Sequence, residues 1–266
     1  MMDTKLADLL QILKNMESAV LAYSGGVDST FLLKALQLSG MRVLAVTAVS
    51  DIIPERDVQN AKTMAEEIGI DHVFIETDEL SIENFVTNPP ERCFYCKDIL
   101  FRKLSEHARN EGYLHVIDGS TIDDLSDYRP GRKAAREHNI RSPLIEADLS
   151  KAKIRKLSKH LNLSTWNKPS SPCLATRFPY GHRLTKEALR RVSKAEDFLK
   201  SIGFETVRVR DHGHLARIEI NNDSLERLVK PTTRKLVSEV LKTLGYDFIS
   251  LDLEGYRSGS MNVLIR

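Results

Sequence analysis

The chain of 266 residues is long enough to form two domains of ordinary size. Its hydrophobic content of 41% and charged content of 29% are typical of a soluble globular protein. Lysine and arginine together number 39, against 37 acidic residues, so the net charge gives no argument for a nucleic-acid partner. No apolar run approaches the roughly 20 residues of a membrane span.

We expect a cytoplasmic protein without membrane attachment. The first residues lack the apolar core of a secretory signal. The three cysteines cannot all pair with one another, which fits a reducing compartment and thiol chemistry better than a disulfide framework.

The first predicted elements are a helix, a strand, a glycine turn and a second helix. Apolar residues repeat at helical spacing from Leu6 to Met16, and residues 20–23 read as a short strand buried on both faces. Residues 29–38 resume a helical pattern after the turn. Two glycines in the turn let a ligand approach the backbone, and the helix start directs unpaired N–H groups to the same place. Such a turn suits a phosphate or a pyrophosphate.

The turn itself, residues 24–29, reads Ser-Gly-Gly-Val-Asp-Ser. It lacks the Gly-Lys-Ser/Thr ending of a Walker A loop and the glycine spacing of dinucleotide folds. It resembles the signature of PP-loop ATP pyrophosphatases. That resemblance implies that the loop holds the β- and γ-phosphates of ATP and releases them together, leaving AMP on a substrate. An ordinary glycine turn capped by Asp28 or Ser29 is the alternative.

Strands and helices alternate through the first half of the chain. Residues 42–49, 72–75 and 114–117 read as three further strands, each preceded by a helix, and one of those helices spans 54–69. This alternation predicts an α/β domain with a doubly wound, mostly parallel sheet, as in PP-loop proteins of the adenine nucleotide alpha hydrolase-like class.

In such a sheet, ligands bind beyond the carboxyl ends of the strands, so three loops should share one rim: residues 24–29, 48–51 and 118–124. The third loop carries three carboxylates that could help to hold Mg²⁺ and ATP oxygens. A helix cap followed by a solvated acidic turn is the alternative. Tyr128 and Arg129 could close over a nucleotide, or belong to a surface loop.

The pattern changes after a helix over 149–161 and a linker over 162–171. The expected elements are a helix over 185–202, antiparallel strands over 206–210 and 215–220, helices near 224–229 and 232–244, and a strand over 248–253. We therefore expect a PP-loop domain over residues 1–165 and a second, smaller α+β domain over residues 172–266.

Cysteines mark the remaining candidate site. Cys93 and Cys96 form a C-x-x-C between the third strand and the next helix, and Cys173 lies in a proline-flanked loop where the domains join. The first two could reach one metal centre, and the third could complete a three-sided site whose open iron holds a small sulfur or oxygen species. A zinc site with His182 as fourth ligand, a thioredoxin-type dithiol and unconnected buried cysteines are the alternatives.

Longer motifs identify a family. Besides the glycine loop, the chain carries Asn-Pro-Pro-Glu-Arg-Cys-Phe-Tyr-Cys-Lys, Asp-Gly-Ser-Thr-Ile-Asp-Asp, Asp-Tyr-Arg-Pro-Gly-Arg, Arg-Ser-Pro-Leu, Ser-Pro-Cys-Leu-Ala-Thr-Arg and Arg-Val-Arg-Asp-His-Gly, in that order. Together they resemble the LarE family, the ATP-dependent sulfurtransferases of nickel-pincer nucleotide synthesis. The resemblance implies that a carboxylate of pyridinium-3,5-biscarboxylic acid mononucleotide is adenylated by Mg-ATP. A sulfur nucleophile would then displace AMP and leave a thiocarboxylate.

The source of the sulfur divides that family. Some members have one cysteine, at the position matching Cys173, and give up its own sulfur. Others add a C-x-x-C, as Cys93 and Cys96 do here, and resemble the type that binds a [4Fe–4S] cluster on three cysteines and transfers a sulfide from its open iron. We predict the cluster type, in which all three cysteines are catalytic.

The resemblance also assigns binding residues. ATP binding falls to Ala22, Ser24, Gly25, Gly26, Asp28, Ser29, Val49, Asp118, Gly119, Asp123 and Arg129. Substrate binding falls to Arg177, Arg208 and Arg210, and a metal near the substrate phosphate to Glu196 and Glu219. Without the resemblance, these second-domain charges would be read as solvated surface groups. The implied cofactors are ATP, Mg²⁺ and the cluster, and the implied partners are the nucleotide substrate, a sulfide source and further copies of the chain in a homo-oligomer.

Overall fold

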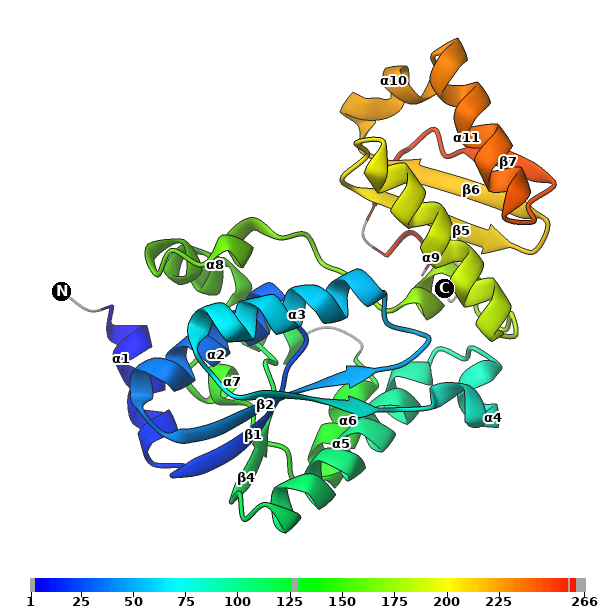
Figure 1. The fold of residues 1–266 in the computed structure, drawn as a ribbon. Coiled ribbons are helices and arrows are strands. Elements are labelled where there is room, and N and C mark those ends of the chain that lie inside the picture. Colours follow the sequence, from blue (N-terminus) through cyan, green and yellow to red (C-terminus); the bar gives the residue numbers. More distant parts are fainter. Residues whose placement is uncertain (1–2, 126–128, 258, 262–266) are drawn as a thin grey trace. The chain divides into compact units, whose positions relative to one another are not determined.

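The computed structural model describes residues 3–125, 129–257 and 259–261. The chain divides into two compact units (Figure 1). The first comprises Met1–Glu79 and Glu91–Ser171, and the second comprises Leu80–Pro90 and Pro172–Arg266. The segment expected to be a linker thus belongs to the first unit, where it includes the short 3₁₀ helix η3, Ser164–Asn167.

The first unit is built on a parallel sheet of four strands in the order β3-β2-β1-β4. The strands are β1 (Ser18–Ala22), β2 (Arg42–Val49), β3 (His72–Glu76) and β4 (His115–Ile117). The central strand β1 pairs with β2 on one side and β4 on the other, so that Val20 lies opposite both Leu44 and Val116. The predicted α/β class and parallel sheet are confirmed.

Helices cover both faces of this sheet. One layer contains α1 (Thr4–Lys14), α2 (Val27–Ser39), α3 (Glu55–Ile68), α7 (Pro143–Glu146) and α8 (Lys151–His160), and the other contains α5 (Arg92–Asn110) and α6 (Gly131–Glu137). Successive strand residues point to opposite faces. Leu21 accordingly belongs to the core beneath the first layer, and Val20 to the core beneath the second. This explains why β1 is apolar from Ala19 to Ala22, as its sequence indicated.

The second unit is a smaller α+β fold, as predicted. Its sheet has the order β5-β6-β7: β5 (Val207–His212) and β6 (Leu215–Ile220) are antiparallel, and β7 (Phe248–Leu251) runs parallel to β6. The remaining elements are α4 (Glu83–Val86), η4 (Leu174–Arg177), α9 (Lys186–Ser201), η5 (Asn222–Ser224), α10 (Leu225–Val229) and α11 (Pro231–Thr243). Apolar side chains of α9, α11 and the strands form its core.

A short excursion of the chain, Leu80–Pro90, joins the second unit although it lies early in the sequence. The Asn88 side chain donates a hydrogen bond to the carbonyl of Pro179 at 2.8 Å, and the Leu184 N–H donates to the carbonyl of Val86 at 2.8 Å. These bonds connect residues far apart in sequence, and no local sequence pattern predicts them. Within the described part of the chain, no helix is long and apolar enough to cross a membrane.

Two leucines of α2 provide a matched test of the first core. Leu36 is 0% exposed in the core and Leu38 is 43% exposed. We predict that Leu36→Ala lowers the free energy of unfolding by about 2–5 kcal/mol, because it leaves a cavity in a packed layer. Leu38→Ala serves as the control and should change it by less than about 0.5 kcal/mol. Denaturant unfolding followed by circular dichroism measures both values, and equal losses would contradict the packing described here.

Candidate functional site

The glycine loop connects the carboxyl end of β1 to the amino end of α2. Gly26 is the N-cap residue of α2 and has no side chain to cap the helix, so the first N–H groups of α2 are open to a ligand. The Ser24 and Ser29 hydroxyls lie 3.0 Å apart across the loop. The helix start, its positive dipole end and two hydroxyls therefore converge on one place, as an anion requires.

Gly25 makes this loop possible in two ways. Its φ of 65° lies in the left-handed region that favours glycine. A Cβ added there would lie 2.9 Å from the Cα of Ala61 in α3, closer than two carbon atoms can approach without a shift. The neighbouring helix α3 thus presses directly on the loop and holds its backbone in place.

Gly119 brings the third rim loop to the same helix end. An added Cβ at Gly119 would lie 3.2 Å from both the Cα and the N of Ser29. The adjoining Asp118 fixes this loop, because its carboxylate accepts hydrogen bonds from the Ser120 N–H at 3.1 Å and from the Ser142 hydroxyl at 2.7 Å. The structure therefore brings Gly119 to the glycine loop and gives Asp118 a role in shaping the rim.

Asp28 lies in the first turn of α2, beside the glycine loop. Within the described part of the chain, its carboxylate makes no hydrogen bond or ion pair. Burial raises the pKa of Asp28 to about 6, and the neighbouring cations Lys151 and Arg155 partly offset that rise. A half-buried carboxylate that no protein group neutralises is a good ligand for a hard cation.

The two acidic residues at the end of the third loop are engaged within the unit. Asp123 accepts a hydrogen bond from the backbone N–H of Lys151 at 2.8 Å, at the start of α8. Asp124 is buried and contacts the Lys151 ammonium at 2.8 Å and the Arg129 guanidinium at 3.1 Å. The helix-cap alternative thus describes Asp123, whereas Asp124 is not the solvated residue that this alternative expected.

The other predicted ATP-binding residues occupy the same rim. Ala22 and Val49 are the last residues of β1 and β2, two adjacent parallel strands. Tyr128 lies outside the described residues. Two cations at this rim were not found from the sequence: Lys151, which contacts Asp124, and Lys168, whose ammonium donates to the carbonyl of Gly25 at 3.1 Å. Both lie more than a hundred residues beyond the loop, so spacing carries no signal for them.

The second unit contains a buried cluster of arginines and carboxylates. Arg177 is fully buried and forms a bidentate pair with Glu196, with Nε–Oε1 at 2.8 Å and Nη2–Oε2 at 3.0 Å. Its third nitrogen donates to the carbonyls of Pro172 at 2.7 Å and Cys173 at 3.2 Å. Arg177 therefore fixes the backbone on which the Cys173 thiol is carried.

Strand register brings the rest of this cluster together. Arg208 lies opposite Glu219 and Arg210 lies opposite Arg217 in the β5–β6 pair. Glu219 contacts Arg210 at 2.6 Å and Arg217 at 3.2 Å. The Arg208 guanidinium lies over the Tyr256 ring, and burial together with the like charge of Arg177 lowers its pKa.

Arg208 lies near the two buried pairs Arg177–Glu196 and Arg210–Glu219, and the arginines of both pairs repel it electrostatically. Guanidinium groups so close together favour an added anion such as a phosphate. Metal binding by the two glutamates stays a prediction: each is already paired with an arginine, and the described residues include no group of three or more His, Cys, Asp or Glu side chains that could hold a metal ion.

None of the three cysteines forms a disulfide, and they are divided between the units. Cys93 and Cys96 were expected in a loop but lie in the first turns of α5, one helical turn apart. The Cys96 thiol is 3.7 Å from Oε1 of the buried Glu79. Cys173 directly precedes η4 in the second unit, and the His182 ring there lies beside Phe178.

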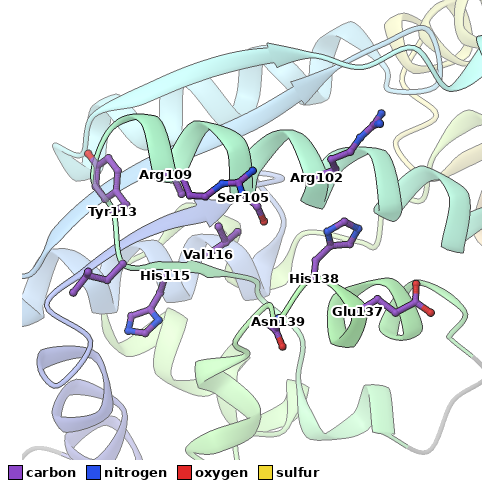
Figure 2. A pocket seen from close by; sticks show the side chains of 11 residues that line it. Arg102, Ser105, Arg109, Tyr113, His115, Val116, Glu137, His138 and Asn139 are labelled. Atoms are coloured by element: carbon purple, nitrogen blue, oxygen red, sulfur yellow. The ribbon is translucent and has the colours of Figure 1, made fainter.

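A cavity of about 470 Å³ opens elsewhere in the first unit (Figure 2). It is lined by α5, the start of β4 and the end of α6, with Arg102, Tyr113, His115 and His138 among its side chains. Since His115 begins β4, this cavity lies toward the amino end of that strand, whereas the glycine loop follows the carboxyl end of β1. No predicted site residue lines it.

The chain is similar to several known proteins. A pyridinium-3,5-bisthiocarboxylic acid mononucleotide synthase of Lactiplantibacillus plantarum is 40% identical over 97% of this chain and 94% of its own. An uncharacterized protein of Synechocystis sp. is 41% identical over 98% of both chains. A tRNA-specific 2-thiouridylase of Rickettsia peacockii is 28% identical over 57% of this chain and 52% of its own. No family model matches.

The close approach of α3 to the glycine loop can be tested by substitution. Gly25 and Gly69 both have positive φ, but a Cβ at Gly69 would meet nothing within 4 Å. We predict that Gly69→Ala costs about 1–2 kcal/mol of unfolding free energy, from backbone strain alone. Gly25→Ala should cost more, because the added methyl also displaces Ala61. Thermal unfolding of the two variants gives the comparison, and an equal cost would show that α3 does not constrain the loop.

Proposed function

The chain belongs to the LarE family of sulfurtransferases, and from this premise we propose that it converts a carboxylate of pyridinium-3,5-biscarboxylic acid mononucleotide to a thiocarboxylate at the expense of ATP. The glycine loop at the open start of α2 is the observation that carries the ATP half of the proposal. The likeness to the synthase of L. plantarum along nearly the whole chain supports the substrate.

In the first step, a carboxylate oxygen of the substrate attacks the α-phosphorus of ATP. The bond from that phosphorus to the bridging oxygen of the β-phosphate breaks, and pyrophosphate leaves in the cradle of Ser24, Gly25 and Gly26. The uncapped N–H groups of α2 stabilise the charge that develops on the leaving group. Asp28, which has no hydrogen-bond or ion-pair partner among the described residues, would hold Mg²⁺ beside the phosphates.

In the second step, a sulfur nucleophile attacks the acyl carbon. The bond from that carbon to the AMP oxygen breaks, so AMP leaves and the thiocarboxylate remains. Adenylation is needed because a free carboxylate would have to expel oxide, a far poorer leaving group than AMP. The closeness of the Arg177, Arg208 and Arg210 guanidinium groups supports an anion site for the phosphate of the substrate nucleotide.

We further propose that Cys93, Cys96 and Cys173 hold a [4Fe–4S] cluster. The donor set fits: none of the three thiols is in a disulfide, two are one turn apart on α5, and no side chain caps that helix, whose positive end favours an anionic centre. A bound cluster would supply an iron without a protein ligand, able to hold the sulfide that the reaction needs. The alternative is that Cys173 gives up its own sulfur, with Arg177 fixing its backbone in either case.

Two other parts of the proposal concern partners and place. Thiolation of tRNA is the rival activity, and the shorter match to the thiouridylases together with the balanced charge favours the small nucleotide. Free cysteines accord with a cytoplasmic protein. A sulfide source and further copies of the chain complete the proposed set of partners.

The decisive experiment compares the cysteines under anaerobic conditions. For the wild type we predict about four irons per chain, with matching acid-labile sulfide, and formation of thiocarboxylate, AMP and pyrophosphate. Cys173→Ala should lose the iron and the sulfur transfer, yet retain ATP–pyrophosphate exchange in the presence of substrate, because adenylation needs no thiol.

Cys93→Ala and Cys96→Ala separate the two sulfur sources. If the cluster supplies the sulfur, both variants lose transfer. If Cys173 is sacrificed, both retain one turnover, and mass spectrometry shows Cys173 lacking one sulfur. A wild type that performs no substrate-dependent exchange would overturn the proposed function itself.

The raised pKa of Asp28 predicts a pH dependence. Metal binding requires the ionised carboxylate, so kcat/KM for Mg-ATP should rise with pH through an inflection near 6. Asp28→Asn should lower kcat/KM and remove that inflection.

The raised pKa of Asp28 also predicts that the folded state loses stability as the pH rises. Protonated Asp28 favours the folded state below its unfolded pKa near 4, and this contribution is lost as the pH rises through about 6. Asp28→Asn should therefore melt at a higher temperature than the wild type at pH 8. A variant that melts lower there would contradict the burial of this carboxylate.

A further inference from the structure

The glycine loop contains no lysine, yet the structure places one against it. The ammonium of Lys168 donates to the carbonyl oxygen of Gly25 at 3.1 Å, although the two residues are 143 positions apart. Lys168 follows η3, in the segment that the sequence suggested was a linker.

The backbone of Lys168 is held on both sides. Its N–H donates to the carbonyl of Thr165 at 2.9 Å, and its own carbonyl accepts from Arg155 Nη2 at 3.0 Å. The other terminal nitrogen of Arg155 donates to the carbonyl of Trp166 at 2.8 Å. The guanidinium of Arg155 on α8 thus holds the backbone of this segment in place, and the fixed backbone sets the direction of the Lys168 side chain.

The ammonium is only partly satisfied by this contact. A lysine has three N–H donors, and the Gly25 carbonyl accepts one. Among the described residues, no carboxylate forms an ion pair with Lys168, whereas Lys151 at the same rim is neutralised by Asp124. Lys168 therefore brings a positive charge and unused donors to the edge of a cradle built for an anion.

We propose that Lys168 is a phosphate-binding residue of this enzyme, which turns its ammonium from Gly25 to the β- and γ-phosphates of ATP and holds pyrophosphate as it leaves. This proposal rests on the proposed function and names a residue that acts within it. Lys168 lies five positions before Cys173, so the proposal also gives this segment of the chain a contact with ATP.

The test is the affinity of full-length protein for three ligands, Mg-ATP, Mg-pyrophosphate and AMP, measured by isothermal titration calorimetry. Lys168→Gln removes the charge and keeps an N–H donor for Gly25. We expect it to weaken ATP and pyrophosphate binding by about tenfold or more, as for the loss of a charged hydrogen bond, and to leave AMP binding unchanged. Lys168→Arg, which keeps the charge, should recover most of the loss.

Lys159→Gln is the matched control, because Lys159 is an exposed lysine whose ammonium lies over Trp166 in the same segment. It should bind all three ligands like the wild type. The proposal would be overturned if Lys168→Gln weakened the binding of ATP and AMP equally. It would also be overturned if the variant melted at a lower temperature with unchanged pyrophosphate affinity, because Lys168 would then have only a structural role. A wild type that binds neither ATP nor pyrophosphate would overturn the proposed function as well.

Discussion

The first unit depends on the packing of three segments against the amino end of α2. Gly25 presses on Ala61 of α3, and Gly119 presses on Ser29, so neither position has room for a side chain. Because the sheet is parallel, β1, β2 and β4 deliver their loops to the same rim, and close packing then fixes the N–H groups of α2 without any capping side chain. A helix start that is fixed in place and has no capping side chain is preorganised to bind an anion.

The carboxylates around this helix start divide into two kinds. Asp118, Asp123 and Asp124 accept hydrogen bonds from the unit itself and shape the rim. Asp28 has no such partner within the described residues and has a raised pKa. The absence of such a bond is what distinguishes Asp28 as the carboxylate that we propose for Mg²⁺, since a bound cation would offset the cost of its buried charge.

In the second unit, arginines compensate the buried carboxylates. Burying a charge costs several kcal/mol unless a partner compensates it, so Arg177 and Arg210 are each paired with a glutamate. The positive charge of Arg208 beside these pairs suits a phosphate, and Arg177 also donates to the backbone carbonyl of Cys173. The proposed anion site and the backbone of Cys173 therefore share one buried network within this unit.

Hydrophobic alternation and the glycine signature, both local, determined the parallel sheet, the antiparallel pair of the second unit and the position of the glycine loop between β1 and α2. Local patterns could not place Cys93 and Cys96 in a helix, because the turn that precedes α5 has no side-chain cap to mark its start. Nor could they show that Leu80–Pro90 joins the second unit, that Glu196 and Glu219 are neutralised by arginines, or that Lys168 reaches Gly25. Each of these depends on contacts between residues distant in sequence, and only the packed chain decides which charges meet.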